Sequence, residues 1–148
     1  MSLLPYEDAL RRIIAAAPAP QAETIKIQQA AGRVLAEPVM AKLTQPPFSA
    51  SAMDGYAVRT ADLTEADTPL TLIGTSQAGE RFEGTLGAGQ TVRIFTGAPV
   101  PEGANAVVMQ ENCTADGDAI TIHQQVETGR NIRPAGGDFT EGLSLIHI

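Results

Sequence analysis

From residue 44 onward, glycine, proline, aspartate and asparagine divide the chain into short apolar runs. The runs read YAVRT, LTLIG, TVRIF, NAVVMQE and AITIH. Short alternating runs between such residues are typical of β-strands. An Asp-Gly pair in ADGD, residues 115–118, lies between two runs and predicts a β-hairpin. Because no long helical pattern separates the runs, we expect a small barrel-like or sandwich domain here.

The opening third of the chain has helical patterns instead. LPYEDALRRIIAAA, residues 4–17, predicts a helix with acidic residues in its first turn, and PAP at residues 18–20 ends it. The helix would place its apolar residues on one face: Tyr6, Leu10, Ile13, Ile14 and Ala17. After a short apolar alternation at residues 24–27, QQAAGRVLAE predicts a second helix that Pro38 ends.

Composition excludes several function classes. Apolar residues make up 43% and charged residues 18% of the chain, which is typical of a soluble globular protein. No apolar run is long enough for a membrane span, and the N-terminus lacks a signal-peptide pattern, so we expect a cytoplasmic protein. A net charge of −7 without a basic stripe argues against nucleic-acid binding. With Cys113, His123 and His147 as its only cysteine and histidines, the chain has no internal disulfide or Cys-rich zinc site, and a His-based metal centre or Ser-His-Asp triad is not expected.

The segment PPFSASAMDGYAV, residues 46–58, places a carboxylate in a turn framed by two prolines. One interpretation is an ordinary Asp-Gly turn, in which Asp54 binds its own backbone before a strand at Tyr56. The other is a polar site, because Ser49, Ser51 and Asp54 supply oxygen atoms of the kind that hold a hydrated Mg²⁺. The residues alone leave both open.

Two further segments have similar alternatives. In RIFTGAPVPEGANAVVMQE, residues 93–111, a strand ends near Phe95, and Thr96 and Gly97 present a hydroxyl and a backbone N–H. This segment is either a ligand-binding loop or a plain proline-rich connection. It contains neither a P-loop nor a Rossmann phosphate motif.

In GRNIRPAGGD, residues 129–138, the amides of Gly136 and Gly137 offer an anion site between nearby arginines. The alternative is a connecting segment, in which Arg130 and Arg133 make surface ion pairs that contribute little to stability.

Taken together, the order and spacing of these three segments closely resemble the N-terminal part of the molybdopterin molybdenumtransferase family, the MoeA and gephyrin E-domain type. The resemblance runs from about Pro5 to Gly142 and covers about the first third of a family member. It implies an enzyme that inserts molybdenum from molybdate into adenylylated molybdopterin, with Mg²⁺ as cofactor, and releases AMP and molybdenum cofactor. It also implies a homodimer, with the preceding adenylyltransferase and the molybdoenzyme targets as further partners.

The resemblance also implies a fold class: an α+β, β-rich chain in which a small β-barrel-like domain is inserted into an elongated helix and strand dimerisation domain. Residues 1–20 would pack with a downstream α/β domain. Residues 21–43 and 128–142 would belong to the dimerisation domain, and residues 44–127 to the inserted β domain. The active cleft would lie between this β domain and the partner subunit's α/β domain.

By motif, the family's functional positions fall on Asp54 and Thr96. Asp54 would bind or orient Mg²⁺, and Thr96 would hydrogen-bond a phosphate or molybdate oxygen. Ser49, Ser51, Met53 and Gly97 would form the rim. A non-catalytic dimerisation or scaffolding module is the alternative function, and a free-standing β-barrel binding domain is a third.

Two departures from the family pattern matter. The family usually has Gly-Glu-Asp where this chain has Gly136-Gly137-Asp138, so a carboxylate is missing. The pterin-binding α/β domain and the C-terminal β domain lie outside the resemblance, so we expect the isolated fragment to be inactive. The last six residues, LSLIHI, match a translated sequencing adapter, and we expect residues 143–148 to be a non-native tail.

Overall fold

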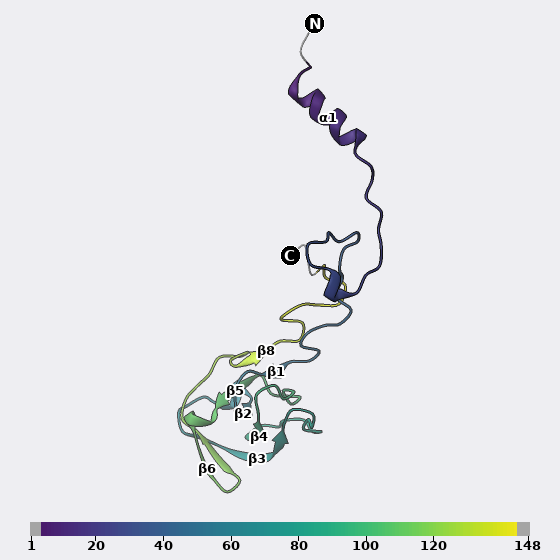
Figure 1. Ribbon diagram of the computed structural model, residues 1–148. Coiled ribbons are helices and arrows are strands. Elements are labelled where there is room, and N and C mark those ends of the chain that lie inside the picture. The colour runs from purple at the N-terminus through teal and green to yellow at the C-terminus, as the bar shows by residue number, and fades with distance from the viewer. Residues whose placement is uncertain (1–3, 145–148) are drawn as a thin grey trace. The chain divides into compact units, whose positions relative to one another are not determined.

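The computed structural model describes residues 4–144 of the 148 (Figure 1). The chain divides into two compact units, residues 1–38 and 39–148. Within residues 4–144 the fold is β-rich and contains one α-helix. Its elements are α1 (Tyr6–Ala16), η1 (Ile27–Gln29), β1 (Ala50–Ser51), β2 (Gly55–Val58), η2 (Thr60–Asp62), β3 (Thr68–Ser76), β4 (Gln90–Ile94), β5 (Ala106–Met109), η3 (Gln110–Asn112), β6 (Cys113–Asp116), β7 (Ala119–Ile122) and β8 (Ile132–Arg133).

The first unit confirms the first predicted helix and not the second. Helix α1 follows Pro5, and its last carbonyls accept hydrogen bonds from the Ala17 amide. The second predicted helix was wrong, because only the short 3₁₀ turn η1 forms there. The glycine in that segment has a left-handed backbone, with φ of +75° at Gly32, which ends helical geometry. No residue of α1 or η1 is buried, so no packing offsets that break.

The second unit contains a curled, half-barrel sheet of six strands in the order β5-β2-β4-β3-β7-β6. Every neighbouring pair is antiparallel except β3 and β4, which run parallel. The Asp-Gly signal is confirmed: Asp116 pairs with Ala119, so Gly117 and Asp118 form the two-residue turn of the β6–β7 hairpin. Figure 1 shows this hairpin projecting from the sheet.

Apolar side chains cover both faces of the sheet. Tyr56 and Val58 belong to one buried cluster, whereas Ala57, between them on β2, belongs to the other. This follows from the alternation of side chains along a strand. The first cluster also contains Leu63, Leu70, Ala106, Val108, Ile120 and Ile122, and the second Leu86, Val92, Ile94, Ala98 and Val107.

The segment after β7 returns to the start of the sheet. Strand β8 pairs with β1, and the Val107 amide of β5 donates to the Arg130 carbonyl. The Asn131 side chain donates to the Val107 carbonyl at 2.9 Å. Figure 1 shows β1 and β8 side by side. The return segment is thus hydrogen-bonded to the sheet, whereas an insertion into a dimerisation domain remains an expectation.

Two expectations from the sequence remain: the absence of a membrane span and the non-native tail at residues 143–148. Across residues 4–144, no helix is both long and apolar enough to cross a membrane. Of the tail expected to be non-native, residues 145–148 lie outside the described residues. The Leu143 carbonyl accepts a hydrogen bond from the Ala41 amide.

Candidate functional site

The structure brings together Asp54 and Thr96, which lie 42 residues apart in the sequence. The backbone amide of Thr96 donates to Asp54 Oδ1 at 2.7 Å, and the Thr96 hydroxyl donates to the same oxygen at 2.8 Å. Both residues are exposed. An exposed carboxylate is therefore held in one orientation by two donors from another loop. The interpretation of Asp54 as a turn residue that binds its own backbone does not account for these contacts.

Backbone hydrogen bonds join the two loops that carry this pair. The Ser51 amide donates to the Ala98 carbonyl, and the Gly97 amide donates back to the Ser51 carbonyl at 2.8 Å. Gly97 has φ of +82°, a left-handed conformation that favours glycine and lets the loop turn directly after Thr96. The Val100 amide donates to the Ser49 carbonyl at 2.9 Å. Thr96 is therefore placed by a paired backbone and not by a free loop.

The glycine after Asp54 is required by a close strand approach. A Cβ at Gly55 would lie 1.9 Å from the carbonyl oxygen of Val108 on β5. Such a contact is far shorter than van der Waals distance, so β2 and β5 can pair this closely only with glycine there. Asp54 immediately precedes this fixed point, and its carbonyl accepts from the Gln110 amide at 3.2 Å. The Asp-Gly dipeptide thus anchors the carboxylate to the sheet.

The same contacts determine the charge state of the carboxylate. The backbone hydrogen bond from Thr96, followed by its hydroxyl bond, lowers the pKa of Asp54 below its ordinary value, and the Arg93 charge lowers it further. Each of these donors and charges favours the ionised form. Asp54 is therefore a carboxylate, not a carboxylic acid, at neutral pH.

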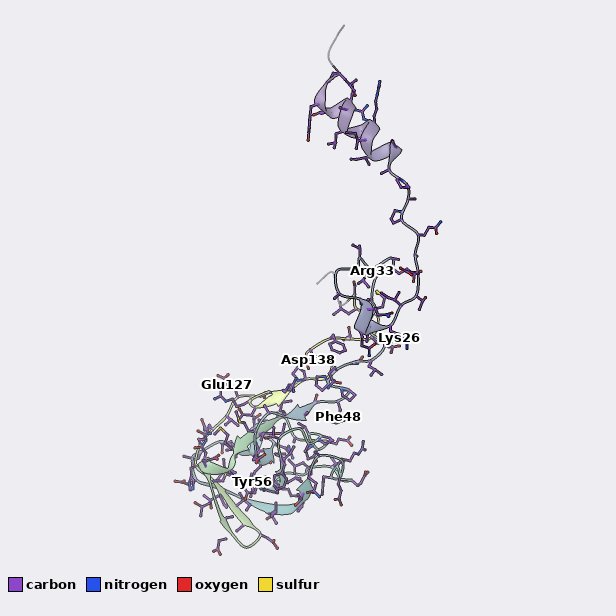
Figure 2. The ribbon with its side chains drawn as sticks, in the orientation of Figure 1. Lys26, Arg33, Phe48, Tyr56, Glu127 and Asp138 are labelled. Carbon is purple, nitrogen blue, oxygen red and sulfur yellow. The ribbon has the colours of Figure 1, made fainter. Side chains whose placement is uncertain are left out.

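The serines expected to join Asp54 have other roles. The Ser51 hydroxyl is buried and donates to the Met53 carbonyl at 2.6 Å, so it closes the turn before Asp54. Met53 is exposed beside the pair. Ser49 lines an open pocket of about 480 Å³ together with Phe48, Phe82 and Val100, and neither Asp54 nor Thr96 lines that pocket. Figure 2 shows Phe48 where the chain enters the sheet. The Ser51 hydroxyl is thus used within its own turn, and Ser49 lines a pocket that Asp54 does not line.

A complete Mg²⁺ site is absent from the part of the chain that the structure describes. Residues 4–144 contain no group of three or more histidine, cysteine, aspartate or glutamate side chains placed to hold a metal. Both Thr96 bonds go to Oδ1 of Asp54, which leaves Oδ2 as one oxygen ligand. Mg²⁺ is usually held by one or two carboxylates together with waters and substrate phosphates. Asp54 fits the role of a single Mg²⁺ ligand and nothing more.

The third predicted segment does not offer an anion site. The Gly136 amide donates to the Pro46 carbonyl and the Gly137 amide to the Pro134 carbonyl, so both amides are used within the backbone. Arg133 Nη2 donates to both carboxylate oxygens of Asp138 at 2.8 Å, which forms a surface ion pair. The alternative interpretation of this segment, as a connection with a surface ion pair, is the one that the structure supports.

Sequence reasoning missed Arg93. Its guanidinium carbon lies 5.0 Å from the centre of the Tyr56 ring and 4.8 Å from that of Phe95. Phe95 follows Arg93 by two residues and lies directly after β4, and in extended chain this spacing places both side chains on one face. That spacing was visible in RIFTG, whereas the contact with Tyr56 depends on the β2–β4 register. Figure 2 labels Tyr56 within the sheet.

The candidate site is therefore an exposed carboxylate and hydroxyl that two joined loops of a β-rich unit hold together. The family comparison makes this more specific. The sequence model of the protein family "MoeA N-terminal region (domain I and II)" matches residues 4–147, so this chain belongs to that family.

Individual relatives agree with this assignment. Over 142 residues the chain is 39% identical to the molybdopterin molybdenumtransferase of Haemophilus influenzae, covering 95% of this chain and 35% of that protein. It is 36% identical to the protein of the same name from Bacillus subtilis, of which it covers 35%. A crystal structure of the molybdopterin biosynthesis moeA protein from Pyrococcus horikoshii OT3 superposes with a TM-score of 0.84 at 34% identity. It covers 97% of this chain and 39% of that one, so this chain spans little more than a third of these relatives.

Proposed function

We propose that this chain is the N-terminal part of an enzyme that inserts molybdenum from molybdate into adenylylated molybdopterin, releasing AMP and molybdenum cofactor. The family membership supports the general role, since the relatives carry the name molybdopterin molybdenumtransferase. One observation in this chain carries the site assignment: Thr96 holds the carboxylate of Asp54 with two hydrogen bonds across two loops. A pure scaffold has no need for such a pair on its surface.

The pair acts as a unit, because a hydroxyl has only one proton. While Thr96 donates that proton to Asp54, it cannot also donate to a molybdate or phosphate oxygen. An oxyanion that accepts a hydrogen bond from the Thr96 hydroxyl must therefore replace Asp54 as the acceptor of that bond. Asp54 would keep its orientation during the exchange, since the Thr96 amide also donates to it. The proposed role of Thr96 as an oxyanion donor thus couples substrate binding to the state of the carboxylate.

An anionic carboxylate repels an anionic substrate unless a cation lies between them. In this proposal Asp54 contributes one ligand to Mg²⁺, and water and substrate oxygens contribute the rest. The bound ion would supply charge neutralisation at the phosphate and molybdate oxygens. Asp54 itself would orient the ion and supply one negative charge. Met53 and Gly97 would shape the rim around it.

The remaining parts of the proposal concern what the chain assembles with. The full-length enzyme would be a cytoplasmic homodimer in which this β domain faces the partner subunit's α/β domain. Residues 1–20, 21–43 with 128–142, and 44–127 would contribute to the three domains assigned above. The preceding adenylyltransferase and the molybdoenzymes that receive the cofactor would be transient partners.

Molybdenum transfer by a full-length protein that begins with residues 1–142 tests this function. The assay supplies adenylylated molybdopterin, molybdate and Mg²⁺ and measures AMP release and cofactor formation. We expect the full-length protein to be active and Asp54→Asn to lower its activity by at least about 100-fold. The isolated chain should have no activity. Asp62→Asn, which changes a carboxylate elsewhere on the unit, is the matched control. Normal transfer by a folded Asp54→Asn protein would exclude Asp54 from the site, and no transfer by the folded full-length wild type would favour the scaffolding role instead.

A further inference from the structure

Arg93 connects the three strand ends around the Asp54–Thr96 pair. It lies on β4 directly opposite Tyr56 on β2. Its Nη1 donates to the Gly55 carbonyl at 2.8 Å, and its Nη2 donates to the side-chain oxygen of Gln110, which follows β5. One half-buried side chain on β4 therefore contacts β2, the residue after β4 and the first residue of η3 at once.

Each of these contacts is adjacent to the candidate site. Gly55 directly follows Asp54, and Phe95 directly precedes Thr96. The Gln110 amide donates to the Asp54 carbonyl. The Arg93 guanidinium lies over the Phe95 ring and donates to both Gly55 and Gln110. We propose that Arg93 is a positioning residue that fixes Asp54 relative to Thr96.

The geometry requires arginine and not merely a positive charge. A guanidinium is planar, stacks on aromatic faces and donates in two directions at once, whereas a lysine ammonium is a point charge on a flexible stem. At this position the two aromatic contacts and the two hydrogen bonds use all of these properties. Lysine would keep the charge near Asp54 and lose the connection between strands.

The inference rests on the proposed function in that Asp54 and Thr96 are taken as this chain's share of the active site. Its first test does not depend on activity. In a ¹⁵N NMR spectrum of the 148-residue chain, the chemical shift of the Thr96 amide reports its hydrogen bond to Asp54. Arg93→Lys and Arg93→Gln are compared with wild type. Arg59→Lys is the matched control, since Arg59 pairs with Asp62. Glu111→Gln, which neutralises a carboxylate of η3, is a second control.

We expect the Thr96 amide to lose its hydrogen-bonded shift in both Arg93 variants, and to keep it in Arg59→Lys and Glu111→Gln. A wild-type spectrum in Arg93→Lys would overturn the proposal, because charge alone would then be sufficient. A wild-type spectrum in Arg93→Gln would overturn it as well. Loss of the whole sheet spectrum in both variants would overturn it in favour of a general structural role.

Kinetics of the full-length protein provide the second test. We expect Arg93→Lys to lower kcat by about 10- to 100-fold with little change in KM, because a misplaced group affects the transition state more than binding. A rise in KM of about 10- to 100-fold with kcat unchanged would contradict the proposal that Arg93 positions Asp54. If the full-length wild type shows no transfer, the proposed function fails, and if Asp54→Asn retains full activity, the site assignment fails. In either case the NMR result still decides whether Arg93 positions the pair.

Discussion

Residues 4–38 and the six-stranded sheet differ in what happens to their large apolar side chains. In the sheet, Ile94, Val58 and Val108 are completely buried. In the first unit, Ile13 is 69% exposed and Val34 is 94% exposed. A helix of this length is marginal in water unless its apolar face packs against something. The sheet thus contains its own core, whereas the first unit has an apolar pattern without one in residues 4–38.

The comparison bears on the candidate site. Asp54, Thr96 and Arg93 all belong to strand ends or loops of the unit with the buried core. A site that must hold two side chains within hydrogen-bond distance needs such support. Four substitutions test whether the contrast between the two units is real.

Gly55→Ala should have the largest effect. The added Cβ meets the Val108 carbonyl, a backbone atom that cannot rotate away. We expect the free energy of unfolding to fall by more than about 4 kcal/mol, measured by urea denaturation. Gly117→Ala is the control, because the space there is open and only the left-handed backbone is strained, at a cost of about 1–2 kcal/mol. An equal cost for the two would mean that β2 and β5 separate easily.

Ile94→Ala should come next. Ile94 is completely buried in the second apolar cluster, so its truncation leaves a cavity. We expect a loss of about 3 kcal/mol in the free energy of unfolding. The Thr96 amide shift should also move in this variant, since β4 leads into the site. A loss below about 1 kcal/mol would show that this side of the sheet is not closely packed.

Thr96→Val should have a smaller effect, on the pKa of Asp54. The variant removes the hydroxyl donor and keeps the backbone donor, which is the larger cause of the lowered pKa. We therefore expect the Asp54 pKa to rise only part of the way to its ordinary value, measured by carboxyl ¹³C NMR. Because the folded-state pKa is lowered, the stabilisation is present above the unfolded-state pKa and is lost as pH falls through the folded-state pKa.

Thr114→Val is the control for that titration, because Thr114 bonds to His123 on the β6–β7 hairpin. It should leave the Asp54 pKa unchanged. A complete return of the Asp54 pKa in Thr96→Val would show that the backbone bond depends on the hydroxyl. No change at all would show that the hydroxyl bond does not form in solution.

Ile13→Ala should have the smallest effect. The side chain is largely exposed on α1, and alanine is the better helix former, so we expect a change within about 0.5 kcal/mol. The measurement is urea denaturation of the 148-residue chain beside Ile94→Ala. A loss similar to that of Ile94→Ala would erase the contrast, because the helix would then be packed on something in solution.

Local patterns predicted a good part of this fold. Helix α1 was predictable because its apolar period is strong and a Pro-Ala-Pro sequence ends it. The β6–β7 hairpin was predictable because an Asp-Gly turn determines register over a few residues. The second helix was not, since Gly32 outweighed good helix formers around it. The parallel pairing of β3 with β4 joins segments whose order in the sheet no local signal specifies.

The candidate site, too, was predictable where local patterns specify it and not where it depends on tertiary contacts. Asp54 and Thr96 were predicted from a motif resemblance, and the turn at Gly97 was visible in the sequence. The close approach of β5 to Gly55 was not. The role of Ser51 was not, because a hydroxyl that bonds a backbone two residues away looks the same in sequence as one that binds a ligand. Arg93 was missed because its contacts with Tyr56, Gly55 and Gln110 depend on the register of β2 with β4 and β5.

The hydrogen bonds between β5 and residues 130–131 have a consequence for association between molecules. An uncovered outer strand presents free N–H and C=O groups that recruit strands of other molecules and lead to aggregates. Here the return segment occupies the Val107 amide and carbonyl. The opposite outer strand, β6, has only four residues and ends in a charged aspartate. The sheet is therefore protected against edge-to-edge pairing with other molecules. The return segment covers the β5 edge, and β6 is a short strand with an aspartate at its end.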